Sequence, residues 1–167
     1  MVYIVEYYIN KYEKYIIHPA WLVGFIDGEG TFSIDILNNQ SIALNYQVQL
    51  RFILTQHIRD KDLIIAIKEY FNCGTLVKDT EIKIQYRMRS LNDLETKLFP
   101  ILDKYPLQTQ KYLDEQTFRQ VFLIIKNGEH LTEKGLDEIR YLKSTMNRGR
   151  MKQFKKDFFM GSNNMPL

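Results

Sequence analysis

The chain has 167 residues, of which 45% are hydrophobic, so it is long enough for one compact domain with a core and too short for two domains of ordinary size. Its 23 basic and 20 acidic side chains leave a formal net charge of only +3, so overall charge alone does not indicate a polyanionic partner. The single cysteine, Cys73, excludes an intramolecular disulfide and a zinc site built on several thiols, which favours a reducing compartment and a core position for this residue.

Residues 1–18 are predicted to form an extension ahead of the domain. Charged residues from Glu6 to Lys14 interrupt its tyrosines and isoleucines, so it lacks the apolar stretch of a signal peptide or a membrane helix. We therefore expect a soluble protein without membrane association. The abundance of Ile, Lys, Asn and Tyr fits an AT-rich coding sequence and points to an organelle, either a mitochondrion or a chloroplast.

A short apolar helix is predicted over residues 20–25, where Pro19 suits the first turn and the glycines Gly28 and Gly30 are expected to end it. Apolar and polar residues then alternate strictly from Thr31 to Ile36, which indicates a half-buried strand. A turn at residues 38–40 leads to a second alternating run, residues 45–52, so the two strands are predicted to form a hairpin.

The next part of the chain is predicted to repeat this helix and hairpin order. Apolar residues at helical spacing over residues 63–71 indicate a helix that Asp60 can cap and that residues 72–74 end. A second hairpin follows, and its clearer strand alternates over residues 82–89.

Helices are predicted for the remaining part. Ser90 and Asp93 resemble a capping box at the start of a helix through Leu102, and Thr132 opens a last helix that ends near Met146. The helix between them, residues 111–126, has a predicted buried stripe of Phe118, Val121, Phe122 and Ile125.

The predicted fold class is therefore α+β, with the order αββαββ followed by two or three helices. The domain is expected to span residues 19–147, and residues 148–167 are expected to be a peripheral tail. No segment repeats the first helix, so the sequence shows no internal duplication at domain scale.

Two carboxylates, Asp27 and Glu29, stand at the carboxyl end of the first helix, where the helix dipole disfavours negative charge. A cation that arrives from outside the helix would explain them. Ala20, Gly24 and Gly28 also recur at four-residue spacing, which leaves a side-chain-poor stripe that a second helix can approach closely. A tight helix pair would form a shared metal site; the alternative is a buried helix followed by solvated loop acids.

Two strands carry outward rows of uncharged polar and basic residues that contain no acid. Glutamine and asparagine can bond adenine edges, and arginine can bond guanine or phosphate, so these are the side chains that a major-groove reader needs. An ordinary solvated sheet face is the alternative. The predicted DNA-binding residues are Ser33, Asn45, Gln47, Gln49, Arg51, Lys83, Gln85, Arg87 and Arg89.

The segment Leu22 to Gly30 resembles the LAGLIDADG motif of homing endonucleases, with Glu29 in the place of the second acid and Val23 in the place of the motif alanine. The order of elements from Pro19 to Met146 also resembles that family. The resemblance implies a saddle-shaped antiparallel sheet with helices on one face, which lies in the major groove of double-stranded DNA. It also implies hydrolysis of one phosphodiester bond on each strand of a long site.

The resemblance also implies roles for single residues. Glu29 and Gly28 would bind Mg²⁺ or another divalent cation such as Mn²⁺, and Asp27 would mainly brace the motif turn. Gln56 would help to order the catalytic water, and Lys111, with Lys104 as its rival, would polarise the scissile region. A plain strand-end residue and a solvated helix-entry lysine are the alternatives for Gln56 and Lys111. The three histidines show no metal-ligand spacing and are assigned no role.

One motif supplies one acid-tipped helix, whereas a double-strand cut needs an active site on each strand. We therefore expect a homodimer that pairs through the small-residue stripe and recognises a palindromic or near-palindromic site. A single repeat of a longer two-motif enzyme is the rival interpretation. Two other functions stay open, an intron RNA-splicing maturase and a non-cleaving DNA-binding protein of the same fold.

Overall fold

The computed structural model describes residues 15–146, so residues 1–14 and the predicted tail lie outside the described part. The chain divides into two compact units, the first with residues up to Ser33 and Leu50–Thr109, the second with Ile34–Gln49 and the residues from Gln110 onward. Four strands form one antiparallel sheet in the order β1-β2-β4-β3, which confirms the predicted α+β class. The strands are β1 (Gly30–Asn38), β2 (Tyr46–His57), β3 (Thr75–Thr80) and β4 (Lys83–Met88).

Helices alternate with these hairpins as the sequence predicts. They are α2 (Pro19–Glu29), α3 (Lys61–Phe71), α4 (Leu91–Asp93), α5 (Phe99–Lys104), α6 (Lys111–Lys126) and α7 (Glu133–Ser144), with short turns η1 (Ile58–Asp60), η2 (Leu94–Leu98) and η3 (Glu129–Leu131). None of the helices described between residues 15 and 146 has the length and apolar character needed to span a bilayer.

Helix α2 confirms the predicted apolar helix but extends past its expected end. Nδ1 of His18 accepts a hydrogen bond from a backbone N–H of the first turn at 3.3 Å, and so caps the helix. Gly28 remains helical, so its prediction as a stop was wrong. The helix ends where the chain enters β1 at Gly30, and a Cβ there would lie 2.6 Å from the carbonyl oxygen of Ile26. Both motif acids therefore lie in the last helical turn.

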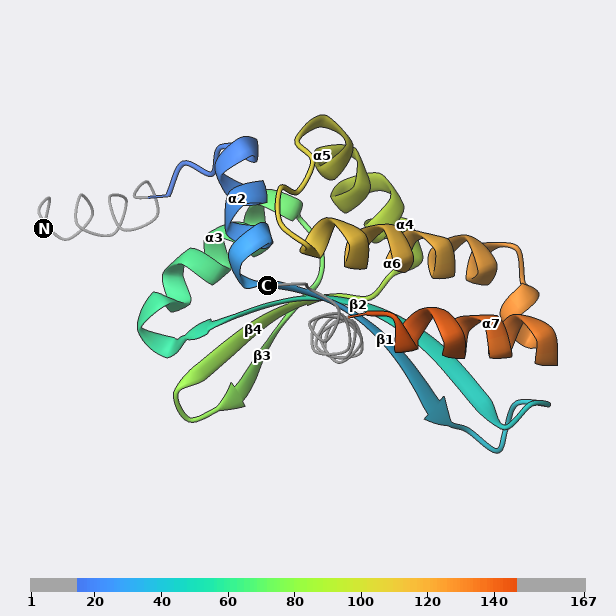
Figure 1. The fold of residues 1–167 in the computed structure, drawn as a ribbon. Helices are drawn as coiled ribbons and strands as arrows, with labels where there is room; N and C mark the ends of the chain where they lie inside the picture. Colours follow the sequence, from blue (N-terminus) through green and yellow to red (C-terminus); the bar gives the residue numbers. More distant parts are fainter. Residues whose placement is uncertain (1–14, 147–167) are drawn as a thin grey trace, which may run out of the picture. The chain divides into compact units, whose positions relative to one another are not determined.

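Aromatic side chains form the centre of the first unit's core. The ring centroid of Phe52 lies 5.5 Å from that of Phe32 and 6.4 Å from that of Tyr86, and Phe71 stacks on Tyr86 at 5.8 Å. One row of rings thus links strands β1, β2 and β4 to helix α3. Figure 1 shows α2, α3 and α5 on the same side of β2, β4 and β3, and the rings of this row are buried.

Three local predictions in the first unit were wrong. Strand β2 continues beyond Phe52, since β4 pairs with it as far as His57. Ile82 lies in the turn before β4 and is 55% exposed, so it does not belong to the buried face. Asp60 makes no capping hydrogen bond, and its carboxylate instead pairs with Arg59 at 3.5 Å.

The helix predicted from Ser90 onward contains one wide turn. The Ser90 hydroxyl accepts a hydrogen bond from the backbone N–H of Asp93 at 3.2 Å, as predicted. Pro100 has no N–H to donate to the preceding turn. Just before this proline, the backbone N–H of Phe99 donates a hydrogen bond to the carbonyl of Leu94, five residues back. This bond makes η2 a π-turn, and the helix continues into α5.

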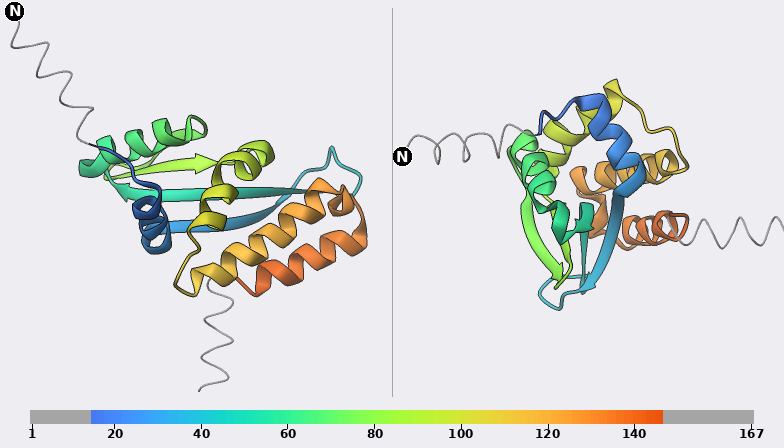
Figure 2. Two further views of the ribbon diagram at one scale, coloured as in Figure 1. Left: turned by 90° about the horizontal axis from the view of Figure 1, so that it is seen from above. Right: turned by 90° about the vertical axis from the view of Figure 1, so that its left-hand side faces the viewer.

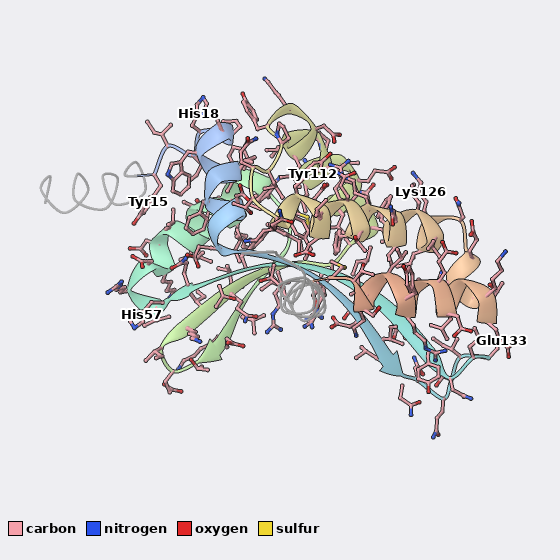
Figure 3. The ribbon with its side chains drawn as sticks, in the orientation of Figure 1. Tyr15, His18, His57, Tyr112, Lys126 and Glu133 are labelled. Carbon is pink, nitrogen blue, oxygen red and sulfur yellow. The ribbon has the colours of Figure 1, made fainter. Side chains whose placement is uncertain are left out.

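In the second unit, α6 and α7 lie side by side (Figure 2). Lys126 ends the first of these helices and Glu133 begins the other (Figure 3). Thr132 caps α7 with its hydroxyl, as predicted. The predicted buried stripe of α6 is confirmed except at one position, where Ile124 rather than Ile125 is buried.

Cys73 lies beside the buried ring of Tyr86, and its Sγ is 3.7 Å from the tyrosine hydroxyl. Burial raises the pKa of both groups, and their mutual hydrogen bond raises that of Tyr86 further. The thiol is therefore held protonated near neutral pH, which agrees with a core role for Cys73 and disfavours a nucleophilic one.

Gly74 supplies a matched test of the packing around Tyr86. Its φ is +75°, and an added Cβ would lie 2.5 Å from the Tyr86 ring, whereas Gly128 has the same φ with nothing within 4 Å of such a Cβ. We expect Gly128→Ala to lower the free energy of unfolding by about 1 kcal/mol, the cost of the backbone conformation alone. Gly74→Ala should cost roughly 2–4 kcal/mol, because it adds steric overlap. Equal losses in urea titrations would contradict the assigned contact.

Candidate active site and nucleic-acid interface

The two acids at the end of α2 have different surroundings. The Asp27 carboxylate accepts hydrogen bonds from the backbone N–H groups of Gln108 at 2.8 Å and Thr109 at 3.1 Å. It also accepts one from the Thr109 hydroxyl at 2.5 Å. Asp27 therefore ties the last turn of the helix to the segment that follows α5, which supports the predicted bracing role.

Glu29 does not brace the fold in this way. Its side chain is exposed, and among residues 15–146 the carboxylate has no hydrogen-bond or ion-pair partner. At a helix C-terminus this charge gains nothing from the helix dipole. A cation brought in by a ligand would stabilise it. The two acids therefore differ in their contacts, because the fold holds Asp27 and does not hold Glu29.

This division predicts different effects on stability. Asp27→Ala should lower the free energy of unfolding by roughly 2 kcal/mol, because it leaves backbone donors without their charged acceptor. Glu29→Ala is the matched control and should change it by less than about 0.5 kcal/mol, as is usual for an exposed side chain without partners. Urea unfolding followed by circular dichroism compares the two, and an equal loss for both would contradict the assignment.

An open groove of about 330 Å³ adjoins Glu29 in the first unit. Its lining residues are Glu29, Thr31, Thr55, Gln56, His57 and Lys83. The structure thus brings together Glu29 and Gln56, both predicted from the motif resemblance, and adds Lys83, which was predicted only as a DNA contact. Gln56 lies within β2 and not past its end, which corrects its expected place.

His57 was assigned no role from the sequence, and neither Thr31 nor Thr55 was singled out. His57 lies at the end of β2 (Figure 3), and its Nδ1 accepts a hydrogen bond from the Arg59 backbone N–H at 3.2 Å. The ladder pairs His57 with Lys83, which places both at the same edge of the groove. Only the register between β2 and β4 reveals this neighbourhood, and no sequence motif marks it.

The two candidate basic residues occupy different units. Lys104 is exposed at the end of α5, with its Nζ 5.4 Å from the ring centroid of Tyr105, and it is not among the residues that line the groove. Lys111 is the first residue of α6 and belongs to the second unit. The catalytic role of either lysine stays a prediction.

The residues at the end of α2 fit a hydrated divalent cation and not a closed metal cage. Residues 15–146 contain no group of three or more His, Cys, Asp or Glu side chains that could enclose a metal. One copy of the chain offers the Glu29 carboxylate and backbone oxygens such as that of Gly28. Mg²⁺ is commonly held by one or two carboxylates together with water and phosphate oxygens, so the donor set suits an ion shared with a phosphate ligand.

The outer face of β2 and β4 carries the predicted polar rows. Buried Phe52, Leu54, Ile84 and Tyr86 point toward the helices, so the residues between them point to the opposite side. We call this opposite side the polar face; in the first unit it comprises Arg51, Lys83, Gln85 and Arg87. In the second unit Gln47 and Gln49 continue the same alternation along β2, and on β1 Ser33 lies between buried Phe32 and Ile34.

Two members of the predicted rows lie outside the strands. Asn45 has a φ of 58° and belongs to the loop between β1 and β2, so strand alternation does not place it in the row. That prediction was wrong because asparagine adopts the left-handed conformation that ends the loop. Arg89 follows the last residue of β4 and is exposed.

The small-residue stripe on α2 is accessible. Ala20, Gly24 and Gly28 are exposed, and an added Cβ at either glycine would meet no atom within 4 Å. Trp21 and Phe25 stack on the same helix with ring centroids 5.3 Å apart, and Trp21 is 47% exposed. The helix therefore presents an open strip of backbone beside an exposed aromatic ring.

A sequence model of the family described as LAGLIDADG endonuclease matches residues 22–122 of the chain. The Neurospora crassa protein named probable intron-encoded endonuclease 3 is 36% identical over 145 residues, which make up 85% of this chain and 27% of that protein. The chain spans 27% of the length of that relative and 32% of the length of a second Neurospora crassa relative, probable intron-encoded endonuclease 2.

Solved structures share the fold. The LAGLIDADG homing endonuclease I-SmaMI bound to cleaved DNA is 37% identical with a TM-score of 0.79, over 82% of this chain and 46% of that chain. I-SmaMI with an uncleaved target in the presence of calcium ions is 36% identical with a TM-score of 0.77, over 80% and 46%. The homing endonuclease I-TnaI is 33% identical with a TM-score of 0.77, over 87% of this chain and 99% of that chain.

Proposed function

The chain belongs to the LAGLIDADG endonuclease family, and from this premise we propose that it recognises a long site in double-stranded DNA and hydrolyses one phosphodiester bond on each strand. The observation that carries the proposal is the state of Glu29. Its carboxylate is exposed, has no partner among residues 15–146, and lines a groove with the amide of Gln56 and the ammonium of Lys83. These three side chains are suited to bind a phosphate together with its cation.

Endonucleases of this family depend on divalent metal ions, and we assign Mg²⁺, or Mn²⁺ in its place, to this chain. When bound, the ion makes water a stronger nucleophile at neutral pH and neutralises the charge that develops on the phosphate oxygens. Glu29 and the Gly28 carbonyl would hold it. The Gln56 amide can both donate and accept, so it suits the orientation of an attacking water. Lys83 supplies a positive charge beside the phosphate, and Lys111 and Lys104 are the further candidates.

The polar face supplies the side chains for recognition of the site. Arginine donates to base edges in the major groove, glutamine both donates and accepts there, and Lys83 and Arg89 can bind phosphates. The I-SmaMI relative is bound to DNA in its solved structures. We assign DNA binding to this chain as well, because it shares the fold and carries acid-free rows on β2 and β4.

We assign two copies of the chain to each cleavage site. One copy has one Glu29, at the end of its single α2 helix. The stripe of Ala20, Gly24 and Gly28 allows a second helix to approach closely. I-TnaI supports this assembly, because its chain is similar in size to this one: the structural match covers 99% of the I-TnaI chain and 87% of this chain. Two-fold symmetry then implies a palindromic or near-palindromic site.

An organelle is proposed as the origin of the chain. Its relative in Neurospora crassa is named as intron-encoded, and the richness in Ile, Lys, Asn and Tyr fits an AT-rich organelle genome. Sequencing the genomic locus tests this, and a nuclear gene would contradict it.

The double substitution Arg87→Ala with Arg89→Ala tests DNA binding by the polar face and by Arg89, which follows β4. We expect DNA affinity to fall by roughly tenfold or more, and the slope of log affinity against log salt to become shallower by about 1 to 2. Fluorescence anisotropy at several salt concentrations measures both. The control is Lys61→Ala with Lys68→Ala on α3, which packs against the opposite face through Phe71. Equal effects of the two double substitutions would contradict the assigned face.

Selection of cleaved sites from a randomised DNA pool tests the whole proposal. In Mg²⁺ we expect one class of near-palindromic sites with short overhangs, and no cut products in a chelator. DNA that is bound but never cut would instead identify a non-cleaving DNA-binding protein. Binding and splicing of intron RNA without DNA cleavage would identify a maturase.

A further inference from the structure

Arg87 on the polar face is already held by two neighbours in the protein alone. Its Nε donates a hydrogen bond to Oε1 of Gln85 at 2.7 Å, and its Nη2 lies 3.8 Å from Oδ1 of Asp79 on β3. The Arg87 side chain is only 18% exposed, and that of Asp79 is 34% exposed. This is an unusual state for a long basic side chain on a surface, because most of its rotamer freedom is already lost.

The hydrogen bond to Arg87 also decides what Gln85 can offer to a ligand. Arginine has only donors, so Gln85 must turn its carbonyl oxygen toward the guanidinium. Its NH₂ group is then the part of the amide that remains for a base. The rest of the guanidinium fork also donates, so the pair presents donors, and one of the two lone pairs of Gln85 Oε1 is already used within the protein.

We propose that Asp79, Gln85 and Arg87 form a prearranged guanine-reading unit, in which Asp79 is a positioning residue that acts through Arg87. The inference rests on the proposed binding of DNA by the polar face. Guanine shows two neighbouring acceptors, O6 and N7, in the major groove, whereas adenine shows a donor beside its acceptor. The free groups of Gln85 and Arg87 are mainly donors, so this pair favours guanine over adenine, although a free glutamine would prefer adenine.

The strand geometry explains how Asp79 reaches Arg87. The ladder between β3 and β4 shifts register between Lys78 and Thr80, so Asp79 is the residue that it skips. Such bulges redirect a side chain from its regular place in a strand. Arg87 itself lies between its ladder partners Ile53 and Thr75. These neighbours on both sides and an acid beyond its tip restrict the guanidinium to one direction along β4.

Asp79 therefore contributes to selectivity more than to affinity. Its negative charge opposes the approach of DNA, so its removal should strengthen binding to any sequence slightly. Its contact with Arg87 reduces the cost of ordering the guanidinium when the correct base is present. The two effects can be separated, because only the second depends on the base.

The experiment selects bound sequences from a randomised DNA pool with the full chain and three variants. We expect the wild type to enrich guanine at one position of each half-site. Arg87→Lys keeps the charge but lacks the fork, so it should lose this preference by roughly tenfold. Asp79→Asn should reduce it roughly threefold. Glu81→Gln is the matched control, since it removes an equal charge from the same hairpin, where Glu81 pairs with Lys78 at 2.8 Å; it should keep the wild-type base preference.

The outcomes separate this inference from the proposed function. If the wild type selects no DNA sequence, the proposed function and this inference both fall. If it selects a site but Asp79→Asn and Glu81→Gln show the same base preference, only the guanine-reading unit is overturned. A lower melting temperature of Asp79→Asn with an unchanged base preference would assign Asp79 a purely structural role and would also overturn it.

Discussion

Glu29→Gln is expected to abolish DNA cleavage while folding and DNA binding remain near their wild-type values. The substitution keeps the shape of the side chain and removes the charge that would hold the cation. Because Glu29 has no partner among residues 15–146, no internal contact is lost. We expect the cleavage rate in Mg²⁺ to fall by a factor on the order of 10³ or more, as for the loss of a group that stabilises developing charge.

The measurement uses a plasmid that carries the selected site, with cleavage followed on gels and binding followed in a chelator. Glu81→Gln serves as the control because it is the same chemical change on the β3–β4 hairpin, at a residue that does not line the Glu29 groove. Cleavage by Glu29→Gln at the wild-type rate would remove this residue from the mechanism.

Gly24→Leu is expected to prevent pairing of the chains and cleavage together. Within one copy, an added Cβ at Gly24 meets no atom within 4 Å, so the variant should fold with near wild-type stability. In a close helix pair the leucine would appear twice across the symmetry axis and hold the two backbones apart. The dissociation constant of the dimer should therefore rise by more than about 100-fold.

Light scattering with and without the selected DNA measures this effect. Gln120→Leu is the matched control, since it places an exposed leucine on another helix, α6, outside the proposed interface. A Gly24→Leu chain that still pairs and cuts would show that the stripe on α2 is not the contact between copies.

The parts of the fold that depend on nearby residues could be predicted from the sequence. The capping side chains of Ser90 and Thr132 and the alternation along β1 all act within a few residues of the feature they produce. One error arose where a distant partner decides the outcome, since the true end of β2 depends on pairing with β4. The end of α2 depends instead on the direct passage into β1 at Gly30, which helical spacing alone does not reveal.

The candidate site shows the same division. Asp27 and Glu29 are neighbours in the sequence. Which of the two braces the fold depends on hydrogen bonds from the backbone of Gln108 and Thr109, far along the chain. The motif resemblance led to Gln56, whereas the place of His57 beside the groove follows only from the register of β2 and β4. Side chains that converge by long-range pairing carry no local signature.

In the proposed enzyme, each of two copies contributes one Glu29 and cuts one strand. Wild-type chain and Glu29→Gln are mixed in varied ratios, and the products from a supercoiled plasmid with the selected site are quantified as nicked or linear. We expect nicked circles to accumulate and to reach a maximum near equal amounts, because a mixed pair holds one active acid. Linear product that merely declines in proportion to the wild-type fraction, without nicked circles, would contradict it, since both cuts would then come from a single copy.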